Sequence, residues 1–167
     1  VEEAYFVIWT TTPWTIPSNV AVCIHEEIEY IFVRGDNDHF IIAKDLLDEC
    51  SDRWGIELEI LGSVLGKEIN EITMAHPLYK RESKLLHGDH VTTESGTGCV
   101  HTAPAHGLDD YFICIKNGLE SVKALDNRGI FKEEYGPLSG LSTKKGDPIV
   151  IELLQDNNCL LYTSPSP

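Results

Sequence analysis

The sequence is poor in positive charge. Only 13 of its 167 residues are lysine or arginine, against 27 aspartates and glutamates, so the formal net charge is −14. Adjacent basic pairs occur only at Lys80-Arg81 and Lys144-Lys145. Because phosphates are bound by clustered cations, this composition argues against a general nucleic-acid-binding protein. If nucleic acid is a partner, we expect most of the attraction to come from elsewhere in a larger protein.

Long apolar runs are also missing. No stretch approaches the roughly 18 apolar residues of a membrane helix, and no charged leader precedes an apolar core at the N-terminus. The first residue is Val1 rather than methionine, so we expect a piece of a longer intracellular protein. Hydrophobic residues at 42% and charged residues at 24% are ordinary for a globular protein of one domain.

Cysteine pairs of the CxxC type are absent. The chain has five widely spaced cysteines, an odd number, which argues against a zinc ribbon and a disulfide framework. We expect reduced, mostly buried thiols.

Apolar alternation and turn signals predict a strand-rich chain. The strands are expected at Tyr5–Thr10, Val20–Ile24, Ile28–Val33, Phe40–Ala43, Ile56–Leu65, Ile69–Ala75, His90–Thr93 and Cys99–Thr102. The polar stretch Lys80–Leu86 is expected to be an exposed connection.

Three helices are expected among these strands. The first covers Asp45–Trp54 and the second Gly107–Lys116, with Leu108, Tyr111, Phe112 and Ile115 as its apolar face. The third opens at Asp147 as N-cap, followed by Pro148. Since strands and helices do not alternate regularly, we expect a mixed α/β fold in which about three helices pack on a barrel-like sheet.

Two stretches combine polar side chains with glycines and prolines that interrupt regular secondary structure, as binding and catalytic loops do. One is WTTTPWTIPSN, Trp9–Asn19, and the other is GTGCVHTAPAHGLDDY, Gly96–Tyr111. We expect them to face each other across one pocket. Thr10, Thr11 and Thr12 could position a water and a substrate, or could simply be residues that favour a β backbone.

The second stretch leaves several chemistries open. His101 and His106 could bind a metal with an aspartate, or one of them could be a loop histidine held by hydrogen bonds. Asp109 and Asp110 suit the start of a helix for local reasons alone, but one of them could also bind a substrate ammonium group. Gly96 and Gly98 allow close backbone approach to a ligand. No GxSxG elbow and no GK[ST] phosphate loop is present.

Together the two stretches resemble the editing domain of isoleucyl-tRNA synthetases. The resemblance runs from about Tyr5 to Leu161 and includes ILGSVLG, AHPL, LLHGDHVT and IVIELLQ. The related valyl and leucyl enzymes carry TTRP, where this chain has Thr12-Pro13-Trp14. Ala105 looks more like mitochondrial-type members. We expect the editing domain to cover residues 1–161 and the non-matching YTSPSP, residues 162–167, to be a disordered tail.

The resemblance implies hydrolysis of valine mischarged on isoleucine tRNA. An apolar pocket discriminates one methylene by only about 1–3 kcal/mol, a magnitude known from this same enzyme family and not obtained from this chain. A second, smaller pocket would supply the remainder. Catalysis would use a positioned water assisted by the tRNA ribose hydroxyl, with no covalent enzyme intermediate.

Site roles follow from the same resemblance. Asp110 would hold the α-ammonium group, His101 would reject the larger isoleucine side chain, and Trp14 would wall the pocket. Thr10, Thr11 and Thr12 would line the amino-acid pocket and place the water. The terminal adenosine would contact Asn19 and the backbone of Gly96, Thr97 and Gly98.

Partners and cofactors are implied as well. The partners would be the 3′ end of aminoacylated isoleucine tRNA and the remainder of a monomeric synthetase chain, in the mitochondrial matrix or a bacterial-type cytoplasm, without a membrane. Editing would need no metal or cofactor. ATP and Mg²⁺ would serve only the parent enzyme, which ligates isoleucine to its tRNA, since HIGH and KMSKS are absent here. The alternatives are a catalytically silent module that binds aminoacyl ends and a small metallohydrolase using His101, His106 and an aspartate.

Overall fold

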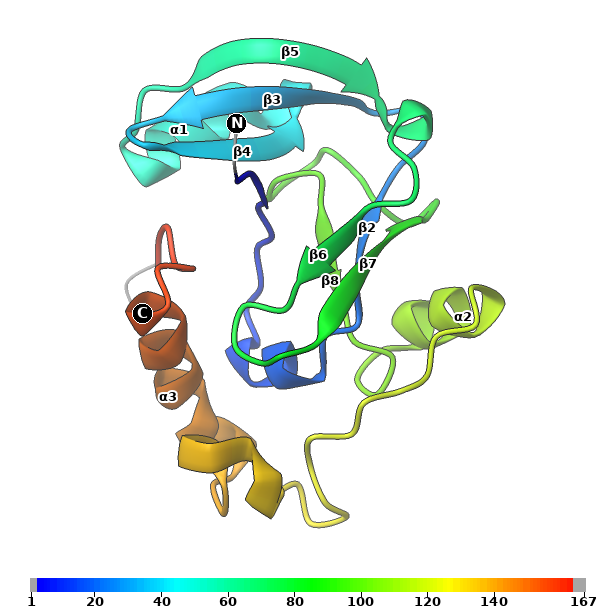
Figure 1. Ribbon diagram of the computed structural model, residues 1–167, viewed down its shortest axis with the longest axis vertical. Coiled ribbons are helices and arrows are strands. Elements are labelled where there is room, and N and C mark those ends of the chain that lie inside the picture. Colours follow the sequence, from blue (N-terminus) through cyan, green and yellow to red (C-terminus); the bar gives the residue numbers. More distant parts are fainter. Residues whose placement is uncertain (1–2, 164–167) are drawn as a thin grey trace. The chain divides into compact units, whose positions relative to one another are not determined.

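The computed structural model describes residues 3–163. The chain divides into two compact units (Figure 1). The first comprises Val1–Trp9, Ala21–Thr73 and Lys84–His101, and the second comprises Thr10–Val20, Met74–Ser83 and Thr102–Pro167. Each unit is therefore assembled from separate segments of the chain.

The first unit contains a four-stranded sheet of order β1-β4-β3-β5. These strands are β1 Tyr5–Phe6, β3 Glu29–Gly35, β4 Asp38–Ala43 and β5 Glu59–Leu65. β1 is parallel to β4, whereas β3 is antiparallel to both β4 and β5 (Figure 1). Only Tyr5 and Phe6 of the expected first strand pair in the sheet. The strands expected at Ile28–Val33 and Phe40–Ala43 pair with each other as β3 and β4, whereas the strand expected at Val20–Ile24 belongs to a different sheet.

One helix packs on this sheet. A 3-10 turn, η2 Lys44–Leu46, leads into α1 Leu47–Trp54. Leu46 and Cys50 are buried, and the Trp54 ring lies 5.9 Å from that of Phe40 on β4. Gly55 ends α1 in the left-handed region at φ 63°, where glycine carries no Cβ penalty.

A second four-stranded sheet has the order β6-β7-β2-β8. Its strands are β2 Ala21–Ile24, β6 Thr73–Ala75, β7 Glu82–His87 and β8 Val100–Thr102. β2 is wholly buried and parallel to β7, with Ala21 opposite Lys84. The expectation of an exposed connection at Lys80–Leu86 is therefore wrong, because Leu85 and Leu86 are buried in a strand. His90–Thr93 forms no strand.

Helices and turns dominate the second unit. They are η1 Pro13–Ser18, α2 Leu108–Lys116, η4 Glu133–Leu138 and α3 Thr143–Asp156. A further 3-10 turn, η3 Gly66–Glu68, lies in the first unit. The core of the second unit is a cluster of buried apolar residues: Ile16, Ala124, Phe131, Leu138, Val150 and Leu154. Gly146 lets α3 pack closely against the Phe131 ring, since a Cβ at this position would lie 2.6 Å from that ring.

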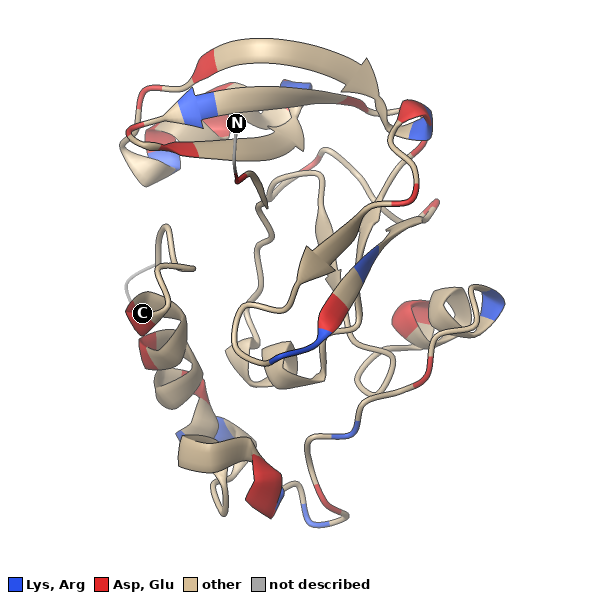
Figure 2. Cartoon of the chain, in the orientation of Figure 1, with Lys and Arg blue, Asp and Glu red and all other residues tan. Residues whose placement is uncertain are grey.

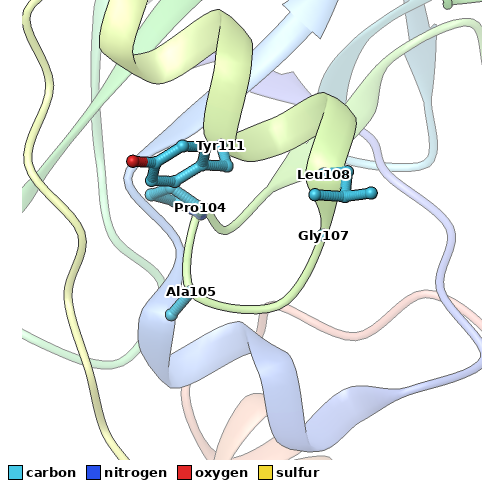
Figure 3. Close-up of a pocket in the computed structure, with 5 residues that line it drawn as sticks. All are labelled: Pro104, Ala105, Gly107, Leu108 and Tyr111. Atoms are coloured by element: carbon cyan, nitrogen blue, oxygen red, sulfur yellow. The ribbon is translucent and has the colours of Figure 1, made fainter.

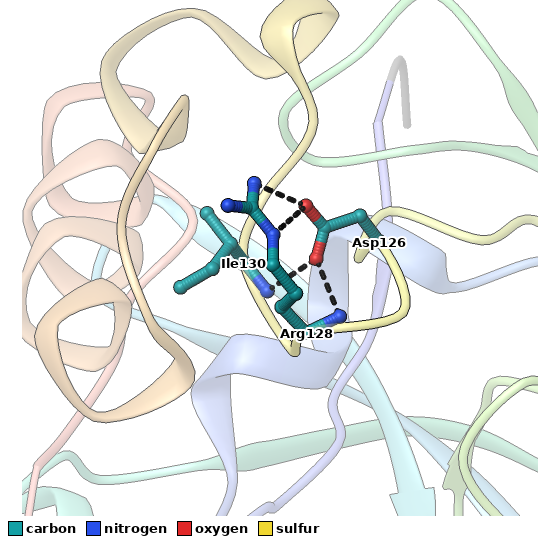
Figure 4. Close-up of polar contacts among 3 residues, drawn as sticks. All are labelled: Asp126, Arg128 and Ile130. Atoms are coloured by element: carbon teal, nitrogen blue, oxygen red, sulfur yellow. Dashed lines mark hydrogen bonds and ion pairs between the residues drawn. The ribbon is translucent and has the colours of Figure 1, made fainter.

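A tight turn at Asp126–Gly129 leads into this core. The Asp126 carboxylate accepts hydrogen bonds from the Arg128 and Ile130 amides and from the Arg128 guanidinium (Figure 4). The Arg128 side chain and these amides hold the pKa of Asp126 below its usual value. The Gly129 amide closes the turn by donating to the Asp126 carbonyl at 3.0 Å.

Two helix predictions need correction. The apolar face expected for α2 is exposed and does not pack on a sheet, with Leu108 76%, Phe112 64% and Ile115 56% accessible, and Cys114 is the buried residue of this helix. Helix α3 begins at Thr143 with Ser142 as N-cap, whose Oγ accepts from the Lys145 amide. Asp147 is therefore not a cap of α3, and Pro148 lies inside the helix.

The fold is mixed α/β, with two four-stranded sheets and three main helices. No closed barrel is found among residues 3–163. All five cysteines are free, and Cys159 alone is exposed; burial raises the pKa of Cys50 to about 11. None of the described helices is both long and apolar enough to cross a membrane. Of the expected disordered tail, residues 164–167 lie outside the described part of the chain.

Candidate functional site

The threonine segment leads directly into η1 in the second unit. The Thr10 hydroxyl accepts a hydrogen bond from the Thr12 amide at 3.0 Å and lies 3.3 Å from the Thr12 hydroxyl. Thr11 is exposed, and its hydroxyl has no hydrogen-bond partner among residues 3–163. The segment therefore presents one unused hydroxyl beside two that contact each other.

The first turn of η1 is held by the preceding residue Thr12 and by Asp147 of α3. The Thr12 carbonyl accepts from the Thr15 amide at 3.0 Å and from the Thr15 hydroxyl at 2.9 Å. The Trp14 amide donates to Oδ1 of Asp147 on α3 at 2.9 Å. Free N–H groups at a helix start are commonly satisfied by such carboxylates. Asp147 thus caps η1 instead of its own helix, which the Asp-Pro sequence signal could not reveal.

Asp110 is held by the loop that precedes its helix. Its Oδ2 accepts a hydrogen bond from the Ala103 amide at 2.9 Å. Between them, the His106 amide donates to the Ala103 carbonyl at 3.0 Å, which closes the loop into a turn. A Cβ at Gly107 would lie 3.3 Å from the Asp110 carboxyl carbon, so glycine leaves room beside this carboxylate. Asp109 next to it is exposed.

His106 connects this loop to η1. Its ring contacts the Trp14 ring edge-on, with centroids 4.8 Å apart, and its Nε2 lies 3.2 Å from Oγ of Ser18. Burial lowers the pKa of His106, while the Asp110 carboxylate acts in the opposite direction. The two sequence stretches therefore do meet within the second unit, through Trp14 and His106. Ser18, which also accepts from the Ala124 amide at 3.4 Å, was not singled out from the sequence.

A hollow of about 440 Å³ opens beside this loop (Figure 3). Pro104, Ala105 and Gly107 line it from the loop, and Leu108 and Tyr111 line it from α2. This hollow is not the pocket expected between the threonines and Asp110, because none of those residues lines it.

The remaining candidates lie in or at the border of the first unit. Gly96 and Gly98 have φ near 80°, and a Cβ at Gly98 would lie 2.4 Å from that of Ala43. The Thr97 carbonyl accepts a hydrogen bond from the Ala43 amide at 2.8 Å, and the Thr97 hydroxyl donates to the Val7 carbonyl. This GTG segment is therefore required for packing, whatever it does toward a ligand. His101 is half-buried on β8.

Asn19 is buried at the end of η1. It is 6% exposed, and its Oδ1 accepts from the Ser83 hydroxyl at 2.7 Å. In residues 3–163, no three histidine, cysteine, aspartate or glutamate side chains are grouped as a metal site would require. Acidic residues outnumber basic ones along the cartoon of the described chain (Figure 2). The described geometry offers a carboxylate and hydroxyls for small polar groups.

The chain is similar in sequence to isoleucine–tRNA ligases. No family model matches the chain. It is 39% identical over 161 residues to the isoleucine–tRNA ligase of Desulfitobacterium hafniense, 42% over 160 residues to that of Enterococcus faecalis, and 44% over 164 residues to that of Staphylococcus aureus. These alignments cover 95–96% of this chain but only 17–18% of each ligase. The chain thus spans less than a fifth of the length of these relatives.

Solved structures share the fold. The crystal structure of GlLeuRS-CP1 matches with a TM-score of 0.77 at 18% identity, covering 98% of this chain and 85% of that one. The P. falciparum cytosolic leucyl-tRNA synthetase editing domain matches with a TM-score of 0.72 at 13% identity, covering 96% and 80%. The chain therefore has the fold of leucyl-tRNA synthetase editing domains and is similar, over nearly its whole length, to one segment of isoleucine–tRNA ligases.

Proposed function

We propose that this chain is the editing domain of an isoleucyl-tRNA synthetase and that it hydrolyses valine wrongly esterified to isoleucine tRNA. The observation that carries this proposal is the 39–44% identity to isoleucine–tRNA ligases across 95–96% of the chain, joined to an editing-domain fold. The geometry of the second unit supports it, since a fixed carboxylate and exposed hydroxyls suit a small amino acid ester.

Asp110 binds the α-ammonium group of the misattached valine. The Ala103 amide already sets the direction of its carboxylate, so little orientation is left to be lost when the substrate arrives. Charge-assisted hydrogen bonds between carboxylate and ammonium are stronger than neutral ones. Asp110 thereby places the ester carbonyl at a fixed distance from the binding group.

Thr10, Thr11 and Thr12 line the amino-acid pocket and place the hydrolytic water. Thr11 suits this role best, because its exposed hydroxyl has no partner among residues 3–163. Thr10 and Thr12 hold each other in place. The attack is by water, assisted by the tRNA ribose hydroxyl, and no metal or other cofactor takes part.

Further groups select the amino acid and bind the terminal adenosine. His101 excludes isoleucine by its bulk, and Trp14, packed against His106, forms part of the pocket wall. The terminal adenosine contacts Asn19 and the backbone of Gly96–Gly98.

The partners are aminoacylated isoleucine tRNA and the remainder of a monomeric synthetase chain, which binds ATP and Mg²⁺ for isoleucine ligation. An acidic chain of net charge −14 leaves most tRNA binding to that remainder. The relatives named above are bacterial, which favours a bacterial-type cytoplasm; they lend no support to the mitochondrial type expected from Ala105.

The test is deacylation of purified valyl-tRNA(Ile) by this chain, with isoleucyl-tRNA(Ile) as the matched substrate. We expect valine release above the uncatalysed rate, little isoleucine release, and no effect of a chelator. A Thr11→Ala variant should lose most of the activity. Tight binding of a non-hydrolysable valyl-adenosine analogue without turnover would instead indicate a silent binding module, and loss of activity with a chelator would indicate a metallohydrolase.

A further inference from the structure

The loop that follows β6 contains a buried histidine that the function has not used. His76 is 5% exposed, and its amide donates to the Arg81 carbonyl at 2.8 Å, which closes residues 76–81 into a loop. Its Nε2 lies 2.9 Å from the carbonyl oxygen of Ile16 on η1. His76 therefore joins two segments that are 60 residues apart in sequence.

The two ring nitrogens have opposite roles. Nδ1 accepts hydrogen bonds from the amides of Leu78 at 3.0 Å and Tyr79 at 3.2 Å. A neutral imidazole has one acceptor and one donor nitrogen, so the proton resides on Nε2, which donates to the Ile16 carbonyl. Nδ1 thus organises the loop of His76 itself, and Nε2 anchors η1.

Arg81 adds a second anchor at the next residue of η1. Its Nη2 donates to the Pro17 carbonyl, and its guanidinium lies 5.6 Å from the centre of the Tyr79 ring. Two successive carbonyls of η1 are therefore bound by side chains of the same loop.

These anchors matter because η1 is a 3-10 helix that contains two prolines. Pro13 and Pro17 lack an N–H, and 3-10 hydrogen bonds have poor geometry. At the two ends of the helix, backbone bonds join Thr15 to Thr12 and Asn19 to Ile16. This helix follows Thr12 directly, carries Trp14 and is followed by Asn19.

We propose that His76 is a positioning residue of the editing site, which holds η1 through the Ile16 carbonyl and so sets the place of the threonine segment and Trp14. This inference rests on the proposed function. His76 acts on the substrate through η1, to which it is joined by the Ile16 carbonyl.

Two conservative variants separate the role of Nδ1 from that of Nε2. In His76→Asn the amide oxygen lies near the place of Nδ1 and keeps the loop, but the side chain is too short to reach the Ile16 carbonyl. In His76→Gln the terminal NH₂ lies near the place of Nε2 and keeps the anchor, whereas the acceptor for Leu78 and Tyr79 is lost. The matched control is His87→Asn, since Nε2 of His87 also lies 2.9 Å from a backbone carbonyl, that of Gly66 in the first unit.

Two readouts are measured well below the melting temperature. In valyl-tRNA deacylation, His76→Asn should lower kcat by about ten- to a hundredfold, the effect of a small misplacement of catalytic groups, with a smaller change in KM. His76→Gln and His87→Asn should stay within about threefold of the unchanged chain. In hydrogen exchange, the Thr15 and Asn19 amides should exchange faster in His76→Asn than in His76→Gln.

The outcomes are distinct. If His76 served only its own loop, Gln would be the worse substitution, the Leu78 and Tyr79 amides would exchange faster, and kcat of the folded protein would not change; that result overturns the inference. If the unchanged chain releases no valine, the proposed function fails, and exchange at Thr15 and Asn19 still decides whether His76 holds η1. Unchanged exchange there in His76→Asn overturns the inference in either case.

Discussion

The Ala103 amide donates a 2.9 Å hydrogen bond to Oδ2 of Asp110, seven residues further along the chain. This bond orients a carboxylate in the first turn of α2, where the helix N-terminus already favours negative charge. Asp109 shares the turn but is exposed. The pair therefore offers a natural comparison between a carboxylate with a fixed direction and one without.

Replacing Asp110 by Asn should lower valyl-tRNA deacylation by about ten- to a hundredfold, since a hydrogen bond to a charged group contributes roughly 1.5–3 kcal/mol. The Asn oxygen still accepts from Ala103, so the fold should persist. Initial rates with valyl-tRNA(Ile) measure this. Asp109→Asn is the control and should keep its activity; equal losses in both variants would contradict a specific role for Asp110.

Replacing His101 by Ala should let the domain hydrolyse correctly charged isoleucyl-tRNA(Ile), because the larger side chain would no longer be excluded. Discrimination by size alone amounts to about 1–3 kcal/mol per methylene, so isoleucine release should rise by about ten- to a hundredfold while valine release changes less. Parallel deacylation assays provide the measurement. Continued protection of isoleucyl-tRNA in this variant would show that His101 is not the steric gate.

Replacing Asp147 by Ala should destabilise the second unit, because the Trp14 amide loses its carboxylate partner. The loss of a helix cap costs about 0.5–2 kcal/mol. Urea unfolding followed by tryptophan fluorescence gives the change in free energy of unfolding. Asp147→Asn keeps an acceptor oxygen and should be milder, whereas equal effects of the two substitutions would argue against a capping role.

Acid should weaken the fold through His76. Burial lowers the pKa of His76 to about 4 from its usual 6.5. Between these values the unfolded chain binds a proton that the folded chain does not, so the free energy of unfolding falls as pH drops from about 6.5 to 4. The full loss is about 3 kcal/mol. Urea unfolding of the unchanged chain and His76→Asn at pH 7, 5.5 and 4.5 isolates this contribution, since other groups cancel; a pH-independent difference would contradict it.

Replacing Phe112 by Gln should change the free energy of unfolding by no more than about 0.5 kcal/mol, as for other surface substitutions. Phe112 is 64% exposed, whereas a phenylalanine buried in the core costs about 3–5 kcal/mol when truncated. Phe131→Ala, at a core residue that is 2% exposed, is the comparison. A large loss on Phe112→Gln would show that α2 has an apolar neighbour after all.

The sequence predicted elements better than it predicted their surroundings. The period of apolar residues located α2 to within one residue, because Gly107 and Gly118 bound it. The same period suggested a buried face, since Leu108, Phe112 and Ile115 fall on one side. Periodicity records which residues share a face, and cannot say whether another element covers it.

Other misses have the same origin in distant partners. The polar residues of Lys80–Leu86 predict an exposed connection, yet β7 in this stretch pairs with β2, and Leu85 and Leu86 are buried. Asp147 before a proline has the sequence of an N-cap, but its carboxylate is occupied by Trp14. For the candidate site, the resemblance supplied Asp110 and the threonines, whereas the supports of η1 were visible only in the structure. The histidine of AHPL was the one available signal.

The dependence of η1 on side chains distant in sequence also has a consequence for folding. Its supports come from His76, Arg81 and Asp147, which are 60, 64 and 133 residues away from their partners. Contacts of such separation form late, because a long stretch of chain must first be closed into a loop. A nascent polypeptide truncated before Asp147 would therefore contain every threonine of the segment and still lack the rigid corner that presents them.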